Sequence, residues 1–225
     1  MKRKSIILFA GVVIFGFGLF NQITDAKSTT KVVNQYEYYN HGEDRDFVST
    51  GKTPLYSKPG KSKVVISTKS MKKLSNSKST GNVFRAYRTV TLSNGQTFTK
   101  VVSMNGKYRG FVKSNGVKQI KTLTNVDLSN KVQGQLVTLS NVKAHPIFES
   151  PSYTQYQINR LKYDHVHDKD LFVIDGAVKK TVGGQLYYHV TSTKDKMING
   201  YVYAGKGYLD NQINSSFGGL SLVAR

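Results

Sequence analysis

The clearest structural signal in the chain is the stretch VFRAYRTVTLSNGQTFTKV, residues 83–101. Over residues 83–92 apolar and polar side chains alternate, and Arg88 interrupts the pattern. The apolar face carries Phe84, Ala86, Val90 and Leu92, and the other face carries Arg85, Tyr87, Thr89 and Thr91. Alternation with a period of two predicts a strand with one face in water. The Asn94-Gly95 pair that follows favours a type I′ hairpin.

The rest of the chain is also typical of short strands and turns. Asn105-Gly106 and Asn199-Gly200 repeat the turn signal. After residue 26 no segment shows a convincing amphipathic helix, and we expect only residues 155–163 to form a short helical turn. Residues 61–80 are long for a hairpin loop, so we expect a strand at 63–67 and then a flexible Ser/Lys-rich excursion. This pattern predicts an all-β protein built from small barrels.

The sequence contains an internal duplication. Three landmarks recur in the same order: LYSKP (55–59) and IFESP (147–151), GQTFTKV (95–101) and GQLYYHV (184–190), and GFV (110–112) and GYV (200–202). Their offsets are 92, 89 and 90 residues, so the register drifts by only a few loop residues. Two tandem units of roughly 75 residues are predicted.

The N-terminus has the three parts of a secretory signal. Lys2, Arg3 and Lys4 precede an almost wholly apolar run of 15 residues at 6–20, and 24–26 reads Thr-Asp-Ala. The small residues Thr24 and Ala26, at positions −3 and −1, predict cleavage after residue 26. The alternative is an uncleaved membrane anchor, for which the run is short of the ~20 residues that span a bilayer. We therefore expect a secreted protein.

These features divide the chain into six parts. They are a signal peptide (1–26), a linker or arm (27–45), a first repeat (46–118), a second linker (119–134), a second repeat (135–209) and a C-terminal tail (210–225). A barrel of this size buries so little apolar surface that its own core gives only marginal stability. Packing of the two units, or clasping by residues 27–45 and 211–225, would add burial.

Charge and composition limit the function. Lys and Arg number 33 against 13 Asp and Glu, a formal net charge of +20, which becomes +18 without residues 1–26. The absence of Cys excludes disulfides, thiolate zinc sites, iron–sulfur clusters and cysteine nucleophiles. Such a charge on an exported chain indicates an anionic partner.

The order of the three landmarks resembles the bacterial Src-homology-3-like repeats. The closest kin are the GW modules of Gram-positive surface proteins and autolysins, and the C-terminal wall-binding repeats of lactobacillal surface proteins are similar. Gly110-Phe111 and Gly200-Tyr201 stand where the GW family has Gly-Trp, and this chain has no Trp. The resemblance implies non-covalent, wall-associated attachment to teichoic or lipoteichoic acid, without catalysis or cofactors.

Cations interleaved with aromatic residues suit a phosphate-rich polymer that contains sugars. The candidate polyanion-binding residues are Arg85, Tyr87, Arg88, Lys100, Lys107, Tyr108, Arg109, Phe111, Lys179, Lys180 and Tyr201. Arg85, Arg88 and Arg109 are the preferred anchors, because guanidinium pairs with phosphate through two hydrogen bonds. Two alternatives stay open: individual lysines only solubilise the surface, and Phe111 and Tyr201 are core residues.

Other functional classes have weaker support. The catalytic motifs HExxH, GxSxG and SxxK are absent, so no enzyme is expected. His165 and His167 share one strand face among carboxylates, but a polar turn explains them better than a metal site. The remaining alternative is an extracellular adhesin or interaction module that binds a protein, a glycosaminoglycan or DNA.

The first prediction concerns processing. The mature protein begins near Lys27, because the charged, apolar and small-residue segments before it match a cleavable signal. N-terminal sequencing of the protein recovered from the culture medium checks this expectation. A sequence that starts at Met1 in that material would contradict it.

Overall fold

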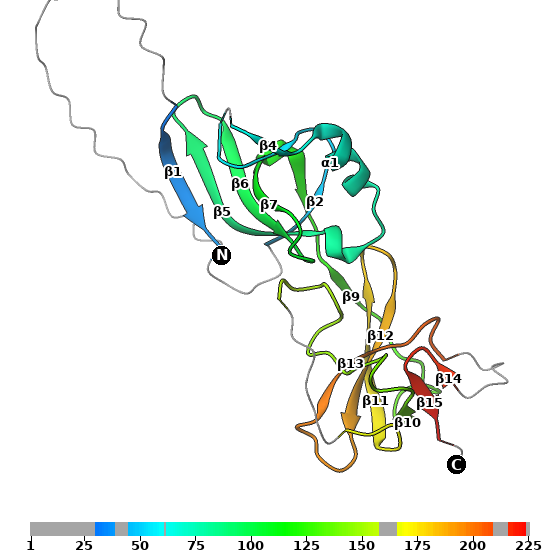
Figure 1. Ribbon diagram of the computed structural model, residues 1–225. Helices are drawn as coiled ribbons and strands as arrows, with labels where there is room; N and C mark the ends of the chain where they lie inside the picture. The colour runs from blue at the N-terminus through cyan, green and yellow to red at the C-terminus, as the bar shows by residue number, and fades with distance from the viewer. Residues whose placement is uncertain (1–29, 39–44, 61, 158–165, 209–215, 224–225) are drawn as a thin grey trace, which may run out of the picture.

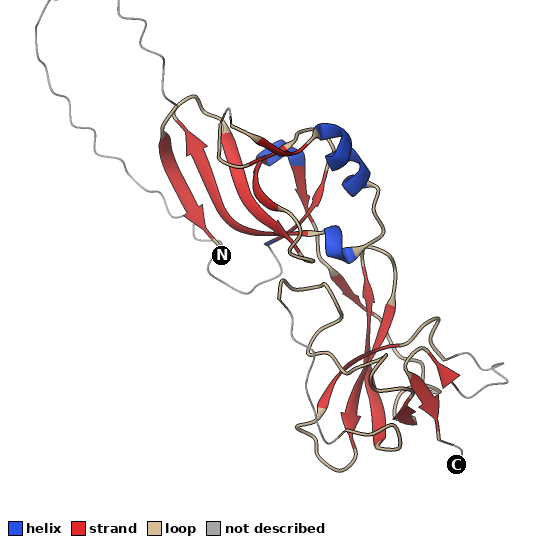
Figure 2. Ribbon diagram, viewed as in Figure 1, coloured by secondary structure: helices blue, strands red, loops and turns tan. Residues whose placement is uncertain are grey.

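The computed structural model describes residues 30–38, 45–60, 62–157, 166–208 and 216–223. The expected signal peptide lies outside the described residues. The described chain is all-β, as expected, and its strands form two sheets in separate small barrel-like units (Figures 1 and 2). In this part of the chain no helix is both long enough and apolar enough to traverse a bilayer.

The first unit is a sheet of eight strands within the described residues, in the order β4-β3-β7-β6-β5-β2-β8, with β1 paired to β5. The strands are β1 (Val32–Glu37), β2 (Asp46–Ser49), β3 (Leu55–Tyr56), β4 (Val64–Ile66), β5 (Phe84–Leu92), β6 (Thr97–Ser103), β7 (Arg109–Lys113) and β8 (Val117–Gln119). Its core includes the apolar face predicted for residues 83–92, and all four of those side chains are buried.

The second unit is a sheet of seven strands in the same described ranges, in the order β13-β12-β11-β10-β15-β14, with β9 paired to β11. The strands are β9 (Leu123–Asn125), β10 (Leu136–Leu139), β11 (Leu171–Lys180), β12 (Leu186–Ser192), β13 (Asn199–Tyr203), β14 (Ser216–Phe217) and β15 (Leu220–Leu222). One cluster of buried apolar side chains, with Phe172 and Ile174 at its centre, fills this unit.

Strand register confirms the duplication. In the first unit β5 pairs with β6 and β6 with β7, and the second unit repeats this with β11, β12 and β13. Phe84 lies opposite Ser103, as Phe172 lies opposite Ser192. Even the irregularity recurs, because the register shifts after Ala86 in β5 and after Ile174 in β11.

The repeats extend further than expected on both sides. β1 pairs with β5 and β9 pairs with β11, so strands inside the expected linkers 27–45 and 119–134 belong to the sheets. β8 pairs with β2 as β15 pairs with β10, which brings part of the expected tail 210–225 into the second sheet. A polar surface strand lacks the alternation that reveals a half-buried one, and this explains the misplaced boundaries.

Residues 61–80 contain a helix that the sequence did not reveal. The strand expected at 63–67 is present as β4, but the segment after it is α1 (Thr68–Ser75), followed by a 3-10 turn, Thr80–Asn82. Ser67 caps the helix by accepting a hydrogen bond from the backbone N–H of Ser70. Met71 is its buried side chain. Leu74 packs partly buried against the same core. Two apolar residues among lysines and serines give too weak a periodicity to recognise.

Three turn predictions also need correction. The 83–101 hairpin is present, but Asn94 is not in the left-handed region and only Gly95 is, with φ +77°. A type I′ turn needs both Asn94 and Gly95 in the left-handed region. A type I turn followed by a left-handed glycine needs only Gly95 in that region. Asn199 and Gly200 lie inside β13 rather than in a turn. The described part of 155–163, up to Gln157, is a turn without helix.

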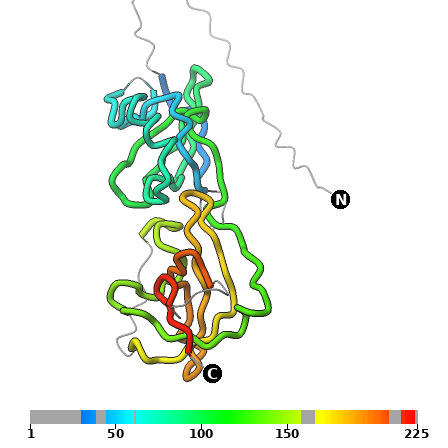
Figure 3. Tube along the Cα trace, turned by 90° about the vertical axis from the view of Figure 1, so that its right-hand side faces the viewer, coloured from blue at the N-terminus to red at the C-terminus, as the bar shows by residue number. Residues whose placement is uncertain are grey.

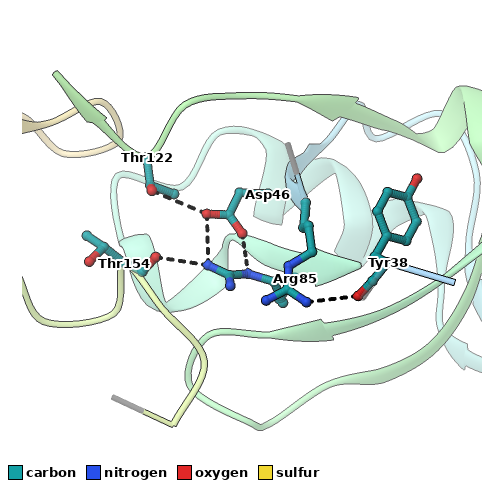
Figure 4. Close-up of polar contacts among 6 residues, drawn as sticks. Tyr38, Asp46, Arg85, Thr122 and Thr154 are labelled. Carbon is teal, nitrogen blue, oxygen red and sulfur yellow. Dashed lines mark hydrogen bonds and ion pairs between the residues drawn. The ribbon is translucent and has the colours of Figure 1, made fainter. Parts of the chain in front are cut away.

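A buried ion pair between Asp46 and Arg85 joins β2 to β5 (Figure 4). Arg85 Nε lies 2.5 Å from Asp46 Oδ1, and Nη2 lies 3.2 Å from Oδ2. The prediction that Arg85 lies on the wet face is wrong, because the side chain is only 8% exposed. Burial raises the pKa of Asp46, and the Arg85 guanidinium opposes that rise.

The same pair reaches toward the second repeat. Arg85 Nη2 also donates to the carbonyl of Thr154, at 3.3 Å. Thr122 Oγ1, between β8 and β9, donates to Asp46 Oδ2 at 3.2 Å. A buried pair of this kind is favourable only when its remaining donors and acceptors are bonded, so both repeats contribute to its stability.

The second prediction tests this pair. Arg85→Met leaves Asp46 buried and unpaired, and we expect it to lower the free energy of unfolding by about 3–5 kcal/mol. The double variant Asp46→Leu/Arg85→Met removes both charges and should cost clearly less. Urea unfolding of the mature chain measures both.

Arg88→Met is the matched control, because the ion pair of Arg88 with Glu37 is partly exposed. We expect that change to cost at most about 1 kcal/mol. An Arg85→Met cost no larger than that of the control would contradict a structural role for the buried pair.

Candidate functional site

The two repeats meet where the start of β7 faces the segment 148–157 of the second repeat. Arg109, the first residue of β7, donates from Nη2 to the hydroxyl of Tyr156 at 3.0 Å. Its guanidinium carbon lies 5.5 Å from the ring centre of Tyr87 and 5.8 Å from that of Tyr156. The two rings pack edge to face, 6.4 Å apart. We call these three residues the Arg109 cluster.

The bulge in β5 explains the position of Tyr87. The register of β5 against β6 shifts between Ala86 and Arg88, which leaves Tyr87 without a pairing partner in β6. A bulge redirects the side chain of its extra residue, and here that residue contacts the second repeat. Burial raises the pKa of Tyr87, while the charge of Arg109 opposes the rise. Tyr87 therefore stays neutral at neutral pH.

Two cavities lie beside this cluster, of about 520 and 530 Å³. Ser152 and Tyr153 line both of them. The first is bounded on the other side by the turn at 104–106 of the first repeat, and the second by residues 78–80. Both cavities are therefore formed by the two repeats together and belong to neither alone.

Lys180, the last residue of β11, is buried between the repeats. Its Nζ donates to Thr80 Oγ1 at 3.2 Å and to Ser152 Oγ at 3.1 Å, and it lies 5.1 Å from the ring centre of Tyr187. Burial lowers the pKa of Lys180 to about 8. Lys180 thus acts as a bridge between the repeats rather than as a surface cation.

The turn after β11 closely approaches the first repeat (Figure 3). A Cβ built on Gly183 would lie 2.3 Å from the carbonyl oxygen of Lys78, and Gly183 has φ +87°. Both the short distance and the left-handed backbone require glycine at this position. Glycine here therefore allows the contact that closes the second cavity.

The expected polyanion-binding residues do not form one patch. Only Tyr87 and Arg109 meet in the Arg109 cluster. Arg85 and Lys180 are buried, which removes their charges from the surface. Arg88 pairs with Glu37. Other candidates lie outside this cluster. Lys107 Nζ lies 5.2 Å from the ring centre of its neighbour Tyr108, and Lys179 is exposed on β11.

Phe111 and Tyr201 occupy equivalent positions, and both are half-buried. Phe111 packs against the cluster of Val90, Leu92 and Phe98, while Lys100 Nζ lies 5.9 Å from its ring centre. Tyr201 lies edge to face with the ring of His189, at 5.0 Å. Each of these half-buried rings therefore lies beside a nitrogen-bearing side chain.

The sequence analysis missed the residues contributed by segment 148–157. Tyr156, Ser152 and Tyr153 follow the IFESP landmark in a polar run with no periodicity. Two tyrosines three positions apart in a Ser/Gln-rich stretch were the available signal, because tyrosine is enriched at contact surfaces. His165 lies outside the described residues, and within them no group of three potential metal ligands occurs.

Comparison with models of protein families and with curated proteins gives no match. Among solved structures, the crystal structure of a candidate autolysin from Listeria monocytogenes is similar, with a TM-score of 0.30 and 12% sequence identity. The match covers 78% of this chain and 64% of the Listeria chain, which is less than two thirds of that protein. These comparisons assign no function to the cavities between the repeats.

The third prediction follows from Lys180. Its folded-state pKa of about 8 lies below the ordinary value of 10.5, so the unfolded chain binds more protons between these values. Stability should rise with pH in this window, by about 2 kcal/mol from pH 7 to 9.5. Urea unfolding at several pH values measures the rise.

Lys180→Met should abolish this pH dependence. Lys179→Met is the control, because Lys179 is exposed on the same strand and should leave the rise unchanged. Equal pH profiles for the wild-type chain and Lys180→Met would contradict the bridging role of a partly deprotonated amine.

Proposed function

We propose that this protein is an exported, non-catalytic binding protein that attaches to anionic polymer of the cell envelope, of the teichoic or lipoteichoic acid class. The observation that carries the proposal is the unequal charge of the repeats. Residues 46–118 hold fifteen Lys and Arg against one carboxylate, and residues 135–209 hold nine against six. The first repeat is thus +14 and the second +3.

Within residues 46–118 no exposed carboxylate offsets the positive charge, although Glu37 on β1 pairs with Arg88. Asp46, the carboxylate in residues 46–118, is 2% exposed and paired with Arg85. The exposed cations of this repeat are Lys52, Lys58, Lys63, Lys69, Lys72, Lys73, Lys78, Lys107, Arg109 and Lys118. A field of one sign attracts a polyanion over about a Debye length, ~8 Å at physiological salt.

Helix α1 concentrates part of this charge. Lys69, Lys72 and Lys73 are exposed on its two turns, while Met71 anchors it to the sheet. A Cβ on Gly51 would lie 2.9 Å from the Cα of Lys72, so the loop that carries Lys52 runs beside the helix. Four ammonium groups on neighbouring segments can neutralise successive phosphates of a flexible polymer.

Arg109 supplies a different kind of contact. It is exposed, and in the described part of the chain one of its five N–H donors is engaged by Tyr156. Two aromatic rings fix the plane of the guanidinium, which is the preorganisation that bidentate recognition of phosphate requires. With Arg85 buried and Arg88 paired to Glu37, Arg109 is the anchor that we retain among the three arginines.

The fourth prediction tests the charge. In the variant Lys69→Gln/Lys72→Gln/Lys73→Gln, the affinity of the mature chain for purified cell walls should fall at least about tenfold at low salt. The slope of log affinity against log salt should become shallower by roughly two to three, by analogy with counterion release from nucleic acid. A salt series of wall pull-downs, with and without teichoic acid, measures both quantities.

The matched control is Lys143→Gln/Lys196→Gln/Lys206→Gln, which removes three exposed charges from the second repeat. We expect a much smaller effect from it. Equal effects of the two triple variants, a flat salt response, or unchanged binding to walls stripped of teichoic acid would each overturn the proposal. The last two results would favour a protein partner instead.

A further inference from the structure

The cavity of about 520 Å³ between the repeats differs in chemistry from the basic surface of the first repeat. Its walls carry aromatic rings from Phe148, Tyr153 and Tyr156 and side-chain amides from Asn105, Gln155 and Gln157. No charged side chain is among its lining residues in the described chain. A phosphate group would find no counter-charge among these lining residues, which favours a neutral occupant.

The backbone of segment 148–157 is held in an unfavourable conformation at this cavity. Tyr153 has φ +58° and Gln157 has φ +59°, the left-handed region that bulky residues rarely adopt. Such positions are energetically unfavourable and cluster at ligand-binding sites. Tyr153 is 49% exposed, so burial of its ring does not offset that cost.

The amides of Gln155 and Gln157 are available to a ligand. Both side chains are exposed, and neither amide makes a hydrogen bond within the described residues. An amide offers two donors and an acceptor, which match the hydroxyl groups of a sugar. A tyrosine ring offers an apolar face to the C–H groups of the same sugar and a hydroxyl at its edge.

We propose that this cavity binds a neutral sugar ring, with Tyr153 as the stacking surface and the amides of Gln155 and Gln157 as hydroxyl partners. The inference rests on the proposed function, since the sugar would belong to the envelope polymer. Arg109 marks the rim, because it is bonded to Tyr156, which also lines the cavity. One ligand can therefore place a sugar in the cavity and a phosphate on Arg109, which defines the polymer as a sugar-containing polyphosphate.

The experiment titrates the mature chain with three probes: maltotetraose, the tetramer of N-acetylglucosamine, and poly(glycerol phosphate) without sugar substituents. We expect one of the two neutral oligosaccharides to bind, and the better one identifies the sugar as a hexose or an N-acylhexosamine. Tyr153→Ala should weaken oligosaccharide binding about tenfold or more, the loss expected when a stacking ring is removed. The same variant should bind poly(glycerol phosphate) unchanged.

Two further variants make the result specific. Tyr36→Ala removes a tyrosine that is 65% exposed on β1, outside the cavity lining, and should change neither affinity. Tyr153→Phe keeps the ring and should retain most of the oligosaccharide affinity. Binding of poly(glycerol phosphate) without binding of either oligosaccharide would overturn this inference alone. If the wild-type chain does not bind poly(glycerol phosphate), the proposed function is overturned.

Discussion

The ion pair of Asp46 and Arg85 is the interaction on which the arrangement of the molecule depends. It joins β2 to β5 inside the first repeat, and its remaining bonds go to Thr122 and to the carbonyl of Thr154. Because a buried charge must keep all its partners, this one network constrains two segments that lead into or belong to the second repeat. The cavities beside segment 148–157 exist because that segment is held there.

Duplication supplied the scaffold, and divergence at equivalent positions supplied its chemistry. The bulge residue of the first repeat, Tyr87, stacks on Arg109, whereas its counterpart Asp175 bonds to His189 Nδ1 at 2.5 Å and to Thr191 Oγ1 at 2.6 Å. The same backbone irregularity thus presents an aromatic ring in one repeat and a carboxylate in the other. This substitution contributes to the unequal charge of the two repeats.

Sequence reasoning succeeded where a pattern is local and repeated. The alternation in residues 83–92 located β5 and its buried face, and the interruption at Arg88 marks the bulge. It failed for α1, where the core-facing side chains are Met71 and the partly buried Leu74, and for β1 and β9, whose polar residues pair at the sheet surface. Hydrogen bonds between backbones stabilise such strands, and side-chain periodicity does not record them.

By itself, the sequence determined the all-β class, the duplication and the positive charge, because each depends on residue type and spacing along the chain. Only the tertiary structure decided which charges remain at the surface. Arg85 and Lys180 are as cationic in sequence as Arg109, yet packing between the repeats buries the first two and exposes the third. The cleft lined by Tyr153 and Tyr156 is likewise a product of packing, since its walls come from segments about 45 residues apart that meet only when both repeats are folded.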